Sequence, residues 1–88
     1  MIRRRVVVFG FVQGVFFRDS LRRRAVTAGV SGWARNNRDG TVEAVFEGDV
    51  SAVEQLVDLS RQGPRGANVD RVEVFPEEPE GLTGFQIR

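Results

Sequence analysis

A chain of 88 residues, 41% of them hydrophobic and 28% charged, has the size and composition of one soluble globular domain with a modest core. The net charge of +1 provides no strong field for nucleic acid or an anionic membrane, so we expect neither as a partner. The absence of Cys, His, Lys and Tyr excludes disulfides, thiolate and imidazole nucleophiles, Schiff bases and the usual zinc sites.

The first predicted element is a buried β-strand over residues 3–9, because residues 6–9 are all β-branched or aromatic. Three arginines open this strand and could bind nucleic acid, but such a cluster is usually the solvated end of a strand. Arginines ahead of a short apolar run also imitate a signal peptide. The run is too short and lacks a small-residue cleavage site, so we expect a cytoplasmic protein without a membrane segment.

Residues 10–18, with the sequence Gly-Phe-Val-Gln-Gly-Val-Phe-Phe-Arg, form a loop between this strand and a predicted helix. Gly10 and Gly14 permit backbone conformations that other residues avoid, and they let a ligand approach the main chain. Free N–H groups before a helix form a natural anion site, and Arg18 adds a permanent planar cation. The loop therefore has two readings: a phosphoryl-binding cradle, or a simple connection followed by an exposed arginine. Without a lysine, it cannot be the P-loop of a nucleotide hydrolase.

The helix is predicted to begin at residue 17 or 18 and to end at Ala28, since apolar residues recur along it every three or four positions. A second strand is predicted over residues 30–37. Alternation along this strand places Asn36 on the same face as Ala34 and opposite to Trp33.

A hairpin turn is predicted next, at residues 37–40, because the sequence Asn-Arg-Asp-Gly is a strong turn signal. Regular alternation over residues 41–47 then predicts a half-buried strand paired with its predecessor. The apolar residues of this strand are expected to face the core, and its carboxylates, Glu43 and Glu47, are expected to face the solvent.

The remaining elements complete a βαββαβ order with one additional strand. They are a helix ending at about residue 62, a loop at residues 63–66, a strand at residues 67–75, a polar loop at residues 76–81 and a short strand at residues 84–88. This order predicts an α+β, ferredoxin-like sandwich: an antiparallel or mixed sheet with both helices on one face and a short fifth strand. We expect one domain over residues 1–88.

The predicted topology brings two polar residues to one end of the sheet. The first two strands of a split βαβ unit run parallel through a right-handed crossover, so their carboxyl ends lie at the same edge. The loop leading to Arg18 leaves the first strand there, and Asn36 lies near the end of the second. Carboxyl ends of parallel strands are common ligand sites, by analogy with open α/β sheets. Taken alone, Asn36 is more typical of a turn, and Gln13 can brace the loop by hydrogen bonds.

These residues carry a resemblance to a known family. Residues 10–18 resemble the first signature of the acylphosphatases, and residues 32–36 followed by residues 39–42 and Gly48 resemble the second. The resemblance extends over nearly the whole chain. Phe11 departs from the pattern, because family members often carry a basic or polar residue at that position.

The resemblance implies a small hydrolase, without metal or cofactor, that cleaves acyl phosphates to a carboxylate and inorganic phosphate. It implies that Arg18 clamps the phosphoryl group and that Asn36 orients the attacking water. Backbone N–H groups would complete the phosphate cradle, those of Gln13, Gly14, Val15, Phe16, Phe17 and Arg18. Inorganic phosphate is then expected as product and inhibitor, and the protein is expected to be a monomer.

Other functions of the same fold make different demands on the sequence. An RNA-binding domain of this type needs aromatic side chains on the open face of the sheet, where the third strand offers Thr41, Glu43, Val45 and Glu47. A metal-carrying domain would need the Cys or His residues that the chain lacks. A non-catalytic module that binds phosphate or an acyl phosphate with the same loop stays open, because only a hydrolysis assay separates it from the enzyme.

Overall fold

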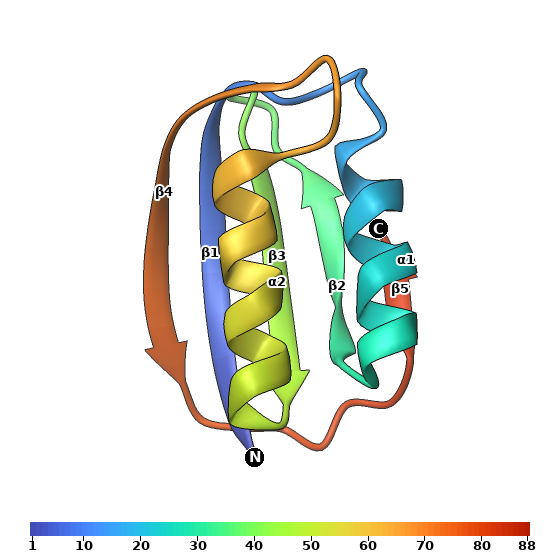
Figure 1. The fold of residues 1–88 in the computed structure, drawn as a ribbon. Helices are drawn as coiled ribbons and strands as arrows, with labels where there is room; N and C mark the ends of the chain where they lie inside the picture. The colour runs from blue at the N-terminus through green and yellow to red at the C-terminus, as the bar shows by residue number, and fades with distance from the viewer.

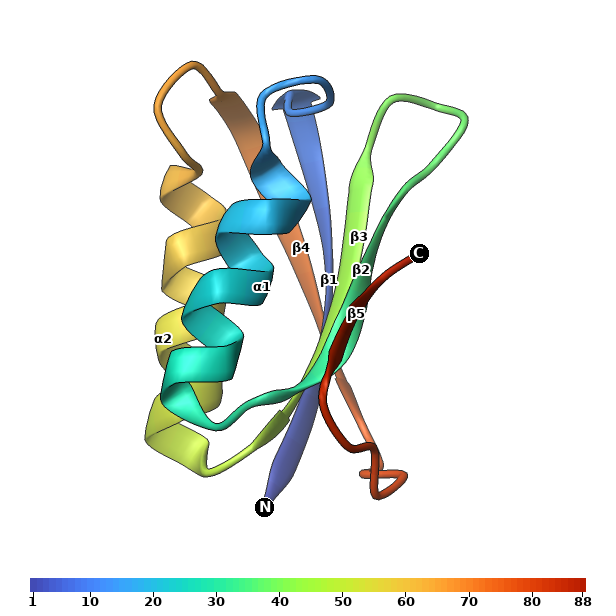
Figure 2. The same ribbon diagram turned by 90° about the vertical axis from the view of Figure 1, so that its right-hand side faces the viewer.

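The computed structural model describes all residues 1–88 and has two layers, a five-stranded sheet and two helices that cover one of its faces (Figures 1 and 2). The elements are β1 (Ile2–Phe11), α1 (Phe17–Ala28), β2 (Ser31–Asn36), β3 (Val42–Gly48), α2 (Val50–Gln62), β4 (Asn68–Glu77) and β5 (Phe85–Ile87). The strand order is β4-β1-β3-β2-β5, and only the pair β2–β5 is parallel. The predicted ferredoxin-like α+β fold with a mixed sheet is therefore confirmed.

The core lies between the helices and the sheet, as the apolar patterns of the strands and helices predict. Alternate residues of β1 and β3 point toward the helices and are fully buried, and both helices bury a stripe that meets them. The fully enclosed side chains include Val6, Val8, Ala34, Val42, Ala44, Phe46, Leu21, Val53 and Leu56. This packing holds the chain segments that reach the upper end of the sheet in Figure 1.

Strand β1 is longer than predicted, because it continues through Gly10 to Phe11. Gly10 has φ 131° and lies at a register shift in the pairing with β4. A Cβ atom at Gly10 would collide with the backbone oxygen of Asn68, so only glycine fits where the two strands approach each other. Gly10, which the sequence analysis assigned to the loop, instead lies at a β-bulge near the end of β1.

Strand β4 also extends beyond its predicted end, into the segment expected to be a loop from residue 76 onward. Pro76 pairs with Arg4, and the strand ends at Glu77. A proline cannot donate a ladder hydrogen bond, yet β4 is an edge strand, and at an edge the missing N–H can face away from the sheet.

The prediction that Glu47 faces solvent is wrong. Its side chain does lie on the sheet face opposite the helices, but its exposed fraction is 1%. Residues 78–84 connect β4 at one edge of the sheet to β5 at the other, on the sheet face away from the helices (Figure 2). The backbone N–H groups of Glu80, Gly81 and Leu82 in this segment donate to the Glu47 carboxylate. Burial therefore comes from a segment more than 30 positions away in the sequence.

The topology also decides which ends of the strands meet. Strands β1 and β2 each pair antiparallel with β3, so they run parallel to each other with β3 between them. Their carboxyl ends, Phe11 and Asn36, therefore lie at the same end of the sheet, the upper end in Figure 1. The loop between β1 and α1 and the end of β2 are neighbours for this reason. Neither helix combines the length and the apolar character that a transmembrane helix needs.

Candidate active site

The loop between β1 and α1 carries a run of unused backbone donors. The N–H groups from Gln13 to Phe16 donate no hydrogen bond within the protein, and no side chain caps the first turn of α1. The N–H groups of the first helical turn have no intrahelical partner by geometry. Unpaired N–H groups at the start of a helix carry a partial positive charge, so this loop is suited to an anion.

The loop turns into the helix through Phe16, which has left-handed backbone angles of φ 60° and ψ 28°. It is the only residue other than glycine with a positive φ. A left-handed residue followed by a helical one points successive N–H groups into a shared concavity, the arrangement found in many anion sites. Such a conformation is costly for a bulky side chain, so the shape of the loop is maintained by its surroundings.

The loop is tied to the β2–β3 hairpin by Gln13. Its Nε2 donates to the backbone oxygens of Asn37 and Thr41, at 2.7 and 3.0 Å. The hairpin is braced in turn by Asp39, whose Oδ1 accepts hydrogen bonds from the N–H and the hydroxyl of Thr41, at 3.0 and 2.6 Å. These bonds hold the pKa of Asp39 below its ordinary value. The expectation that the Gln13 side chain braces the loop is confirmed.

The guanidinium of Arg18 extends from the first turn of α1 and takes part in none of the ion pairs of the structure. Its one internal hydrogen bond runs from Nη1 to the backbone oxygen of Arg88, at 3.3 Å. An arginine with most of its five donors unused can hold an anion through two parallel hydrogen bonds.

Asn36 is the last residue of β2, and its carboxamide makes no hydrogen bond within the protein. Asn36 and Arg18 line the same cavity, which has a volume of about 360 Å³. That volume lies within the range of roughly 300–1,000 Å³ typical of small-molecule sites. The other lining residues are Val12, Gly14, Phe16, Phe17, Asp19 and Ile87.

The structure thus gathers most, but not all, of the residues expected at the site. Gly14, Phe16 and Phe17 line the cavity with Arg18 and Asn36, as the sequence led us to expect. Two members of the expected cradle do not line it. Gln13 turns its side chain to the hairpin, and Val15 lines a different groove, between the two helices.

Three lining residues were not among the site residues expected from the sequence: Val12, Asp19 and Ile87. Ile87 reaches the cavity because β5 pairs parallel with β2, which sets Ile87 beside Ala34. No local sequence pattern predicts that β5 pairs with β2. Asp19 lies in the first turn of α1, where its neighbour Arg18 could have drawn attention to it. A hydrogen bond from Arg22, together with the charge of Arg23, holds the pKa of Asp19 below its ordinary value.

The arrangement combines unused backbone donors, an unpaired guanidinium and a neutral carboxamide in one small cavity. The donors and the guanidinium can neutralise the charge of a phosphoryl group. The carboxamide does not titrate near neutrality, so it can hold a water molecule in place but cannot act as a base. Asp19 is the one carboxylate that lines the cavity, and Arg22 and Arg23 already form ion pairs with it.

Comparison with known proteins agrees with this picture. The family model described as Acylphosphatase matches residues 4–87. An acylphosphatase of Thermococcus kodakarensis is 55% identical over 98% of this chain and 94% of its own length, and one of Rubrobacter xylanophilus is 58% identical over 98% and 79%. The crystal structure of acylphosphatase from Bacillus subtilis superimposes with a TM-score of 0.96 at 32% identity, covering 100% of this chain and 99% of that one. The chain belongs to the acylphosphatase family.

Proposed function

We propose that this protein hydrolyses acyl phosphates to a carboxylate and inorganic phosphate, with Arg18 and Asn36 as its catalytic residues. The observation that carries the proposal is that three kinds of group line one cavity: the Arg18 guanidinium with one internal hydrogen bond, the Asn36 carboxamide with none, and the loop residues Gly14 and Phe16 with unused N–H groups. The matching family model and the similar proteins carry the name acylphosphatase, which supports this reaction class.

The phosphoryl group is held first. Its oxygens accept hydrogen bonds from the N–H groups of the stretch from Gln13 to Arg18, and two of them also accept a bidentate pair from the Arg18 guanidinium. In phosphoryl transfer, charge is distributed over the equatorial oxygens of the transition state. Donors that are already in position stabilise that charge without reorganising, which is the main contribution expected of this site.

Water then attacks phosphorus while the bond to the acyl oxygen breaks. Asn36 holds the water in line with the leaving oxygen, which supplies the proximity term of catalysis. The acyl group departs as a carboxylate with the electron pair of the broken bond. Since a carboxylate has a pKa of roughly 4, it needs no general acid. The proton of the attacking water goes to a phosphoryl oxygen, so a dianionic acyl phosphate and water give one carboxylate and one dihydrogen phosphate anion.

The decisive experiment is hydrolysis of benzoyl phosphate in the presence of EDTA, with inorganic phosphate as inhibitor. We expect turnover that EDTA does not reduce, and competitive inhibition by phosphate because product and substrate share the cradle. Phosphate binding without turnover would instead identify the alternative, a non-catalytic phosphate-binding module. Turnover that disappears in EDTA would contradict a reaction that relies on Arg18 and amides alone.

We also propose that residues 1–88 act as one domain and as a cytoplasmic monomer that binds neither nucleic acid nor membranes. The open face of the sheet supports the last point. Its aromatic rings are already covered by arginines of the same chain: Arg71 lies 3.8 Å from the ring centroid of Phe9, and Arg5 lies 4.4 Å from that of Phe75. Rings covered in this way offer no free platform for stacking bases.

A further inference from the structure

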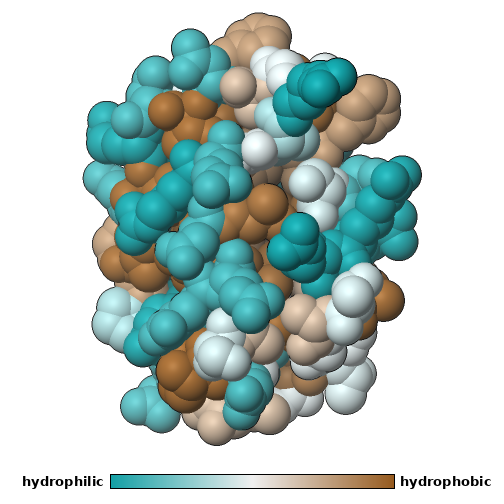
Figure 3. All heavy atoms as spheres, viewed as in Figure 1, coloured by the Kyte–Doolittle hydropathy of each residue, from teal (hydrophilic) through white to brown (hydrophobic).

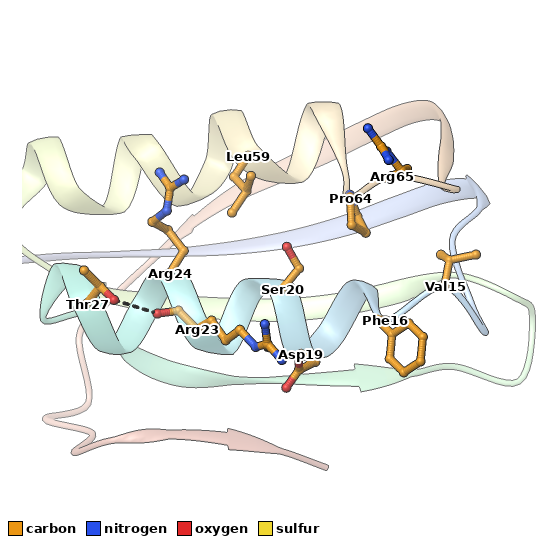
Figure 4. A pocket seen from close by; sticks show the side chains of 10 residues that line it. All are labelled: Val15, Phe16, Asp19, Ser20, Arg23, Arg24, Thr27, Leu59, Pro64 and Arg65. Atoms are coloured by element: carbon orange, nitrogen blue, oxygen red, sulfur yellow. Dashed lines mark hydrogen bonds and ion pairs between the residues drawn. The ribbon is translucent and has the colours of Figure 1, made fainter.

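A second hollow adjoins the candidate active site on the helix side of the molecule. This groove between α1 and α2 has a volume of about 650 Å³, and its lining includes Leu59, Pro64 and Val15 (Figure 4). In the space-filling view of the same face, hydrophobic side chains are visible between the mostly hydrophilic ones of the two helices (Figure 3). Most of the other lining residues are polar or charged, among them Arg23, Arg24 and Arg65, so the groove offers a small apolar patch among charged side chains beside the proposed phosphate cradle.

Only two residues line both the groove and the active-site cavity, Phe16 and Asp19. They form the shared rim between the two hollows. In Figure 4 the ring of Phe16 projects from the start of α1 next to Asp19. The carboxylate of Asp19 is engaged by Arg22 and Arg23, at 2.8 and 2.9 Å. Of the two rim residues, only Phe16 therefore has a side chain that is exposed and free to contact a ligand.

In-line attack determines the direction in which the acyl group leaves. The attacking and leaving oxygens lie on opposite sides of phosphorus. Asn36, which orients the water, lines the active-site cavity but not the groove. The leaving acyl group therefore points away from Asn36, and the groove is the neighbouring hollow that Asn36 does not line.

Phe16 has no structural reason to carry a large apolar ring. Its side chain is 82% exposed, so it contributes little to the core, and it occupies a left-handed conformation that glycine would adopt without strain. An exposed aromatic ring held in an unfavourable backbone conformation at the mouth of a cavity indicates a role in binding.

We infer that Phe16 is a specificity-determining residue whose ring contacts the acyl group of the substrate and favours aromatic over small acyl phosphates. This inference rests on the proposed function. Aromatic pairs prefer stacked or edge-to-face contacts, and such pairs add a modest attraction beyond simple burial. The phosphate cradle uses only the backbone N–H of Phe16, so the side chain can change without loss of that donor.

The test compares kcat/KM for benzoyl phosphate and acetyl phosphate in the wild type and in Phe16→Gly, together with the inhibition constant of inorganic phosphate. Glycine adopts a φ of 60° freely, so this variant keeps the loop conformation. Phe11→Ala is the matched control, because Phe11 is also exposed, at 64%, and lines neither hollow. Phe16→Trp retains an aromatic ring and serves as the conservative variant.

We expect the preference for benzoyl over acetyl phosphate to fall roughly three- to tenfold in Phe16→Gly. It should be unchanged in Phe11→Ala, which should also leave phosphate inhibition unaltered, and it should be largely kept in Phe16→Trp. An unchanged preference in Phe16→Gly, with the wild type active, would overturn this inference alone. An equal loss for both substrates with weaker phosphate inhibition would do the same, because Phe16 would then only shape the loop. A wild type that hydrolyses neither substrate would overturn the proposed function itself.

Discussion

Two arginines at opposite ends of the sheet show how one residue type can serve the fold in one place and a ligand in another. Arg3, at the start of β1, is 6% exposed and is surrounded by the carboxylates of Glu47, Glu77 and Glu80, at 2.7, 2.9 and 3.5 Å. Arg18, beyond the far end of the same strand, forms no ion pair with an Asp or Glu side chain.

The partners of these arginines are arranged just as differently. Glu47 accepts hydrogen bonds not only from Arg3 but also from the N–H groups of Glu80, Gly81 and Leu82, at 2.8, 3.1 and 3.1 Å. At the other end the loop N–H groups and the Asn36 carboxamide have no partner within the protein. Saturated polar groups at one end and unsatisfied ones at the other indicate which end is built to receive a ligand.

The largest expected effect is on activity, at the end of the sheet where the loop N–H groups and the Asn36 carboxamide have no partner within the protein. Arg18→Lys should lower kcat/KM for benzoyl phosphate by about 10³-fold, because a point charge cannot reproduce the two parallel hydrogen bonds of a guanidinium. Urea unfolding of the variant should match the wild type, since Arg18 makes one long internal hydrogen bond. Near-normal kcat/KM would contradict the clamp.

The next effect is on stability, at the opposite end of the sheet, where Arg3 and Glu47 have hydrogen-bond partners within the protein. Glu47→Gln should lower the free energy of unfolding by about 3 kcal/mol, as it removes the buried charge opposite Arg3 and turns an amide N–H toward other donors. We expect the low end of the usual range because Arg3 keeps Glu77 and Glu80.

The matched control is Glu73→Gln, in the exposed pair with Arg71 at 3.6 Å, which should change the unfolding free energy by less than about 0.5 kcal/mol. Activity per folded molecule should be unchanged in both variants. If the two substitutions cost the same, Glu47 does not hold the crossing segment as we describe.

A third variant distinguishes the two catalytic roles at the candidate site, orientation of the water by Asn36 and binding of the phosphoryl group by Arg18. Asn36→Ala should lower kcat by about 10²-fold, because the water loses its alignment. The inhibition constant of inorganic phosphate should change little, since Asn36 does not hold the phosphoryl group. Weaker phosphate inhibition with unchanged kcat would reverse the roles of Asn36 and Arg18.

The smallest effect is a difference in pH response. Burial raises the pKa of Glu47, but the N–H of Glu80, the Arg3 guanidinium and the N–H of Leu82 outweigh it and bring the pKa below its ordinary value of 4.5. Hydrogen bonds from Arg3 and Arg5 lower the pKa of Glu77 in the same direction.

Because these folded-state pKa values lie below the unfolded ones, the stability that they contribute is present above pH 4.5 and is lost as the pH falls through them. Acid titration of the unfolding free energy should show this loss, and Glu47→Gln should reduce its slope. In contrast, kcat should stay level between about pH 6 and 8, since the proposed mechanism assigns no proton transfer to a side chain of the protein. A steep dependence of kcat in that range would contradict this mechanism.

Prediction from the sequence succeeded where the cause is local. The period of two along β3 and the stripe of α1 identified the core face, and the turn residues located the hairpin. The positions of Arg18 and Asn36 at one end of the sheet followed from the parallel direction of β1 and β2, which the βαβ connection predicts. The errors at Gly10, Pro76 and Glu47 share a cause, because each depends on a strand or segment that arrives from far along the chain.

The sequence by itself determined the order of elements, the face of each that is buried and the absence of Cys, His, Lys and Tyr from the site, because these depend on composition and short-range periodicity. Only the tertiary structure decided that Arg3 is surrounded by carboxylates and that Arg18 keeps most of its donors unused. A side chain is neutralised by whatever the fold sets beside it, and the partners of Arg3 lie 44, 74 and 77 positions away in the chain. The left-handed turn at Phe16, and the rim that its ring forms, likewise depend on contacts that no local pattern encodes.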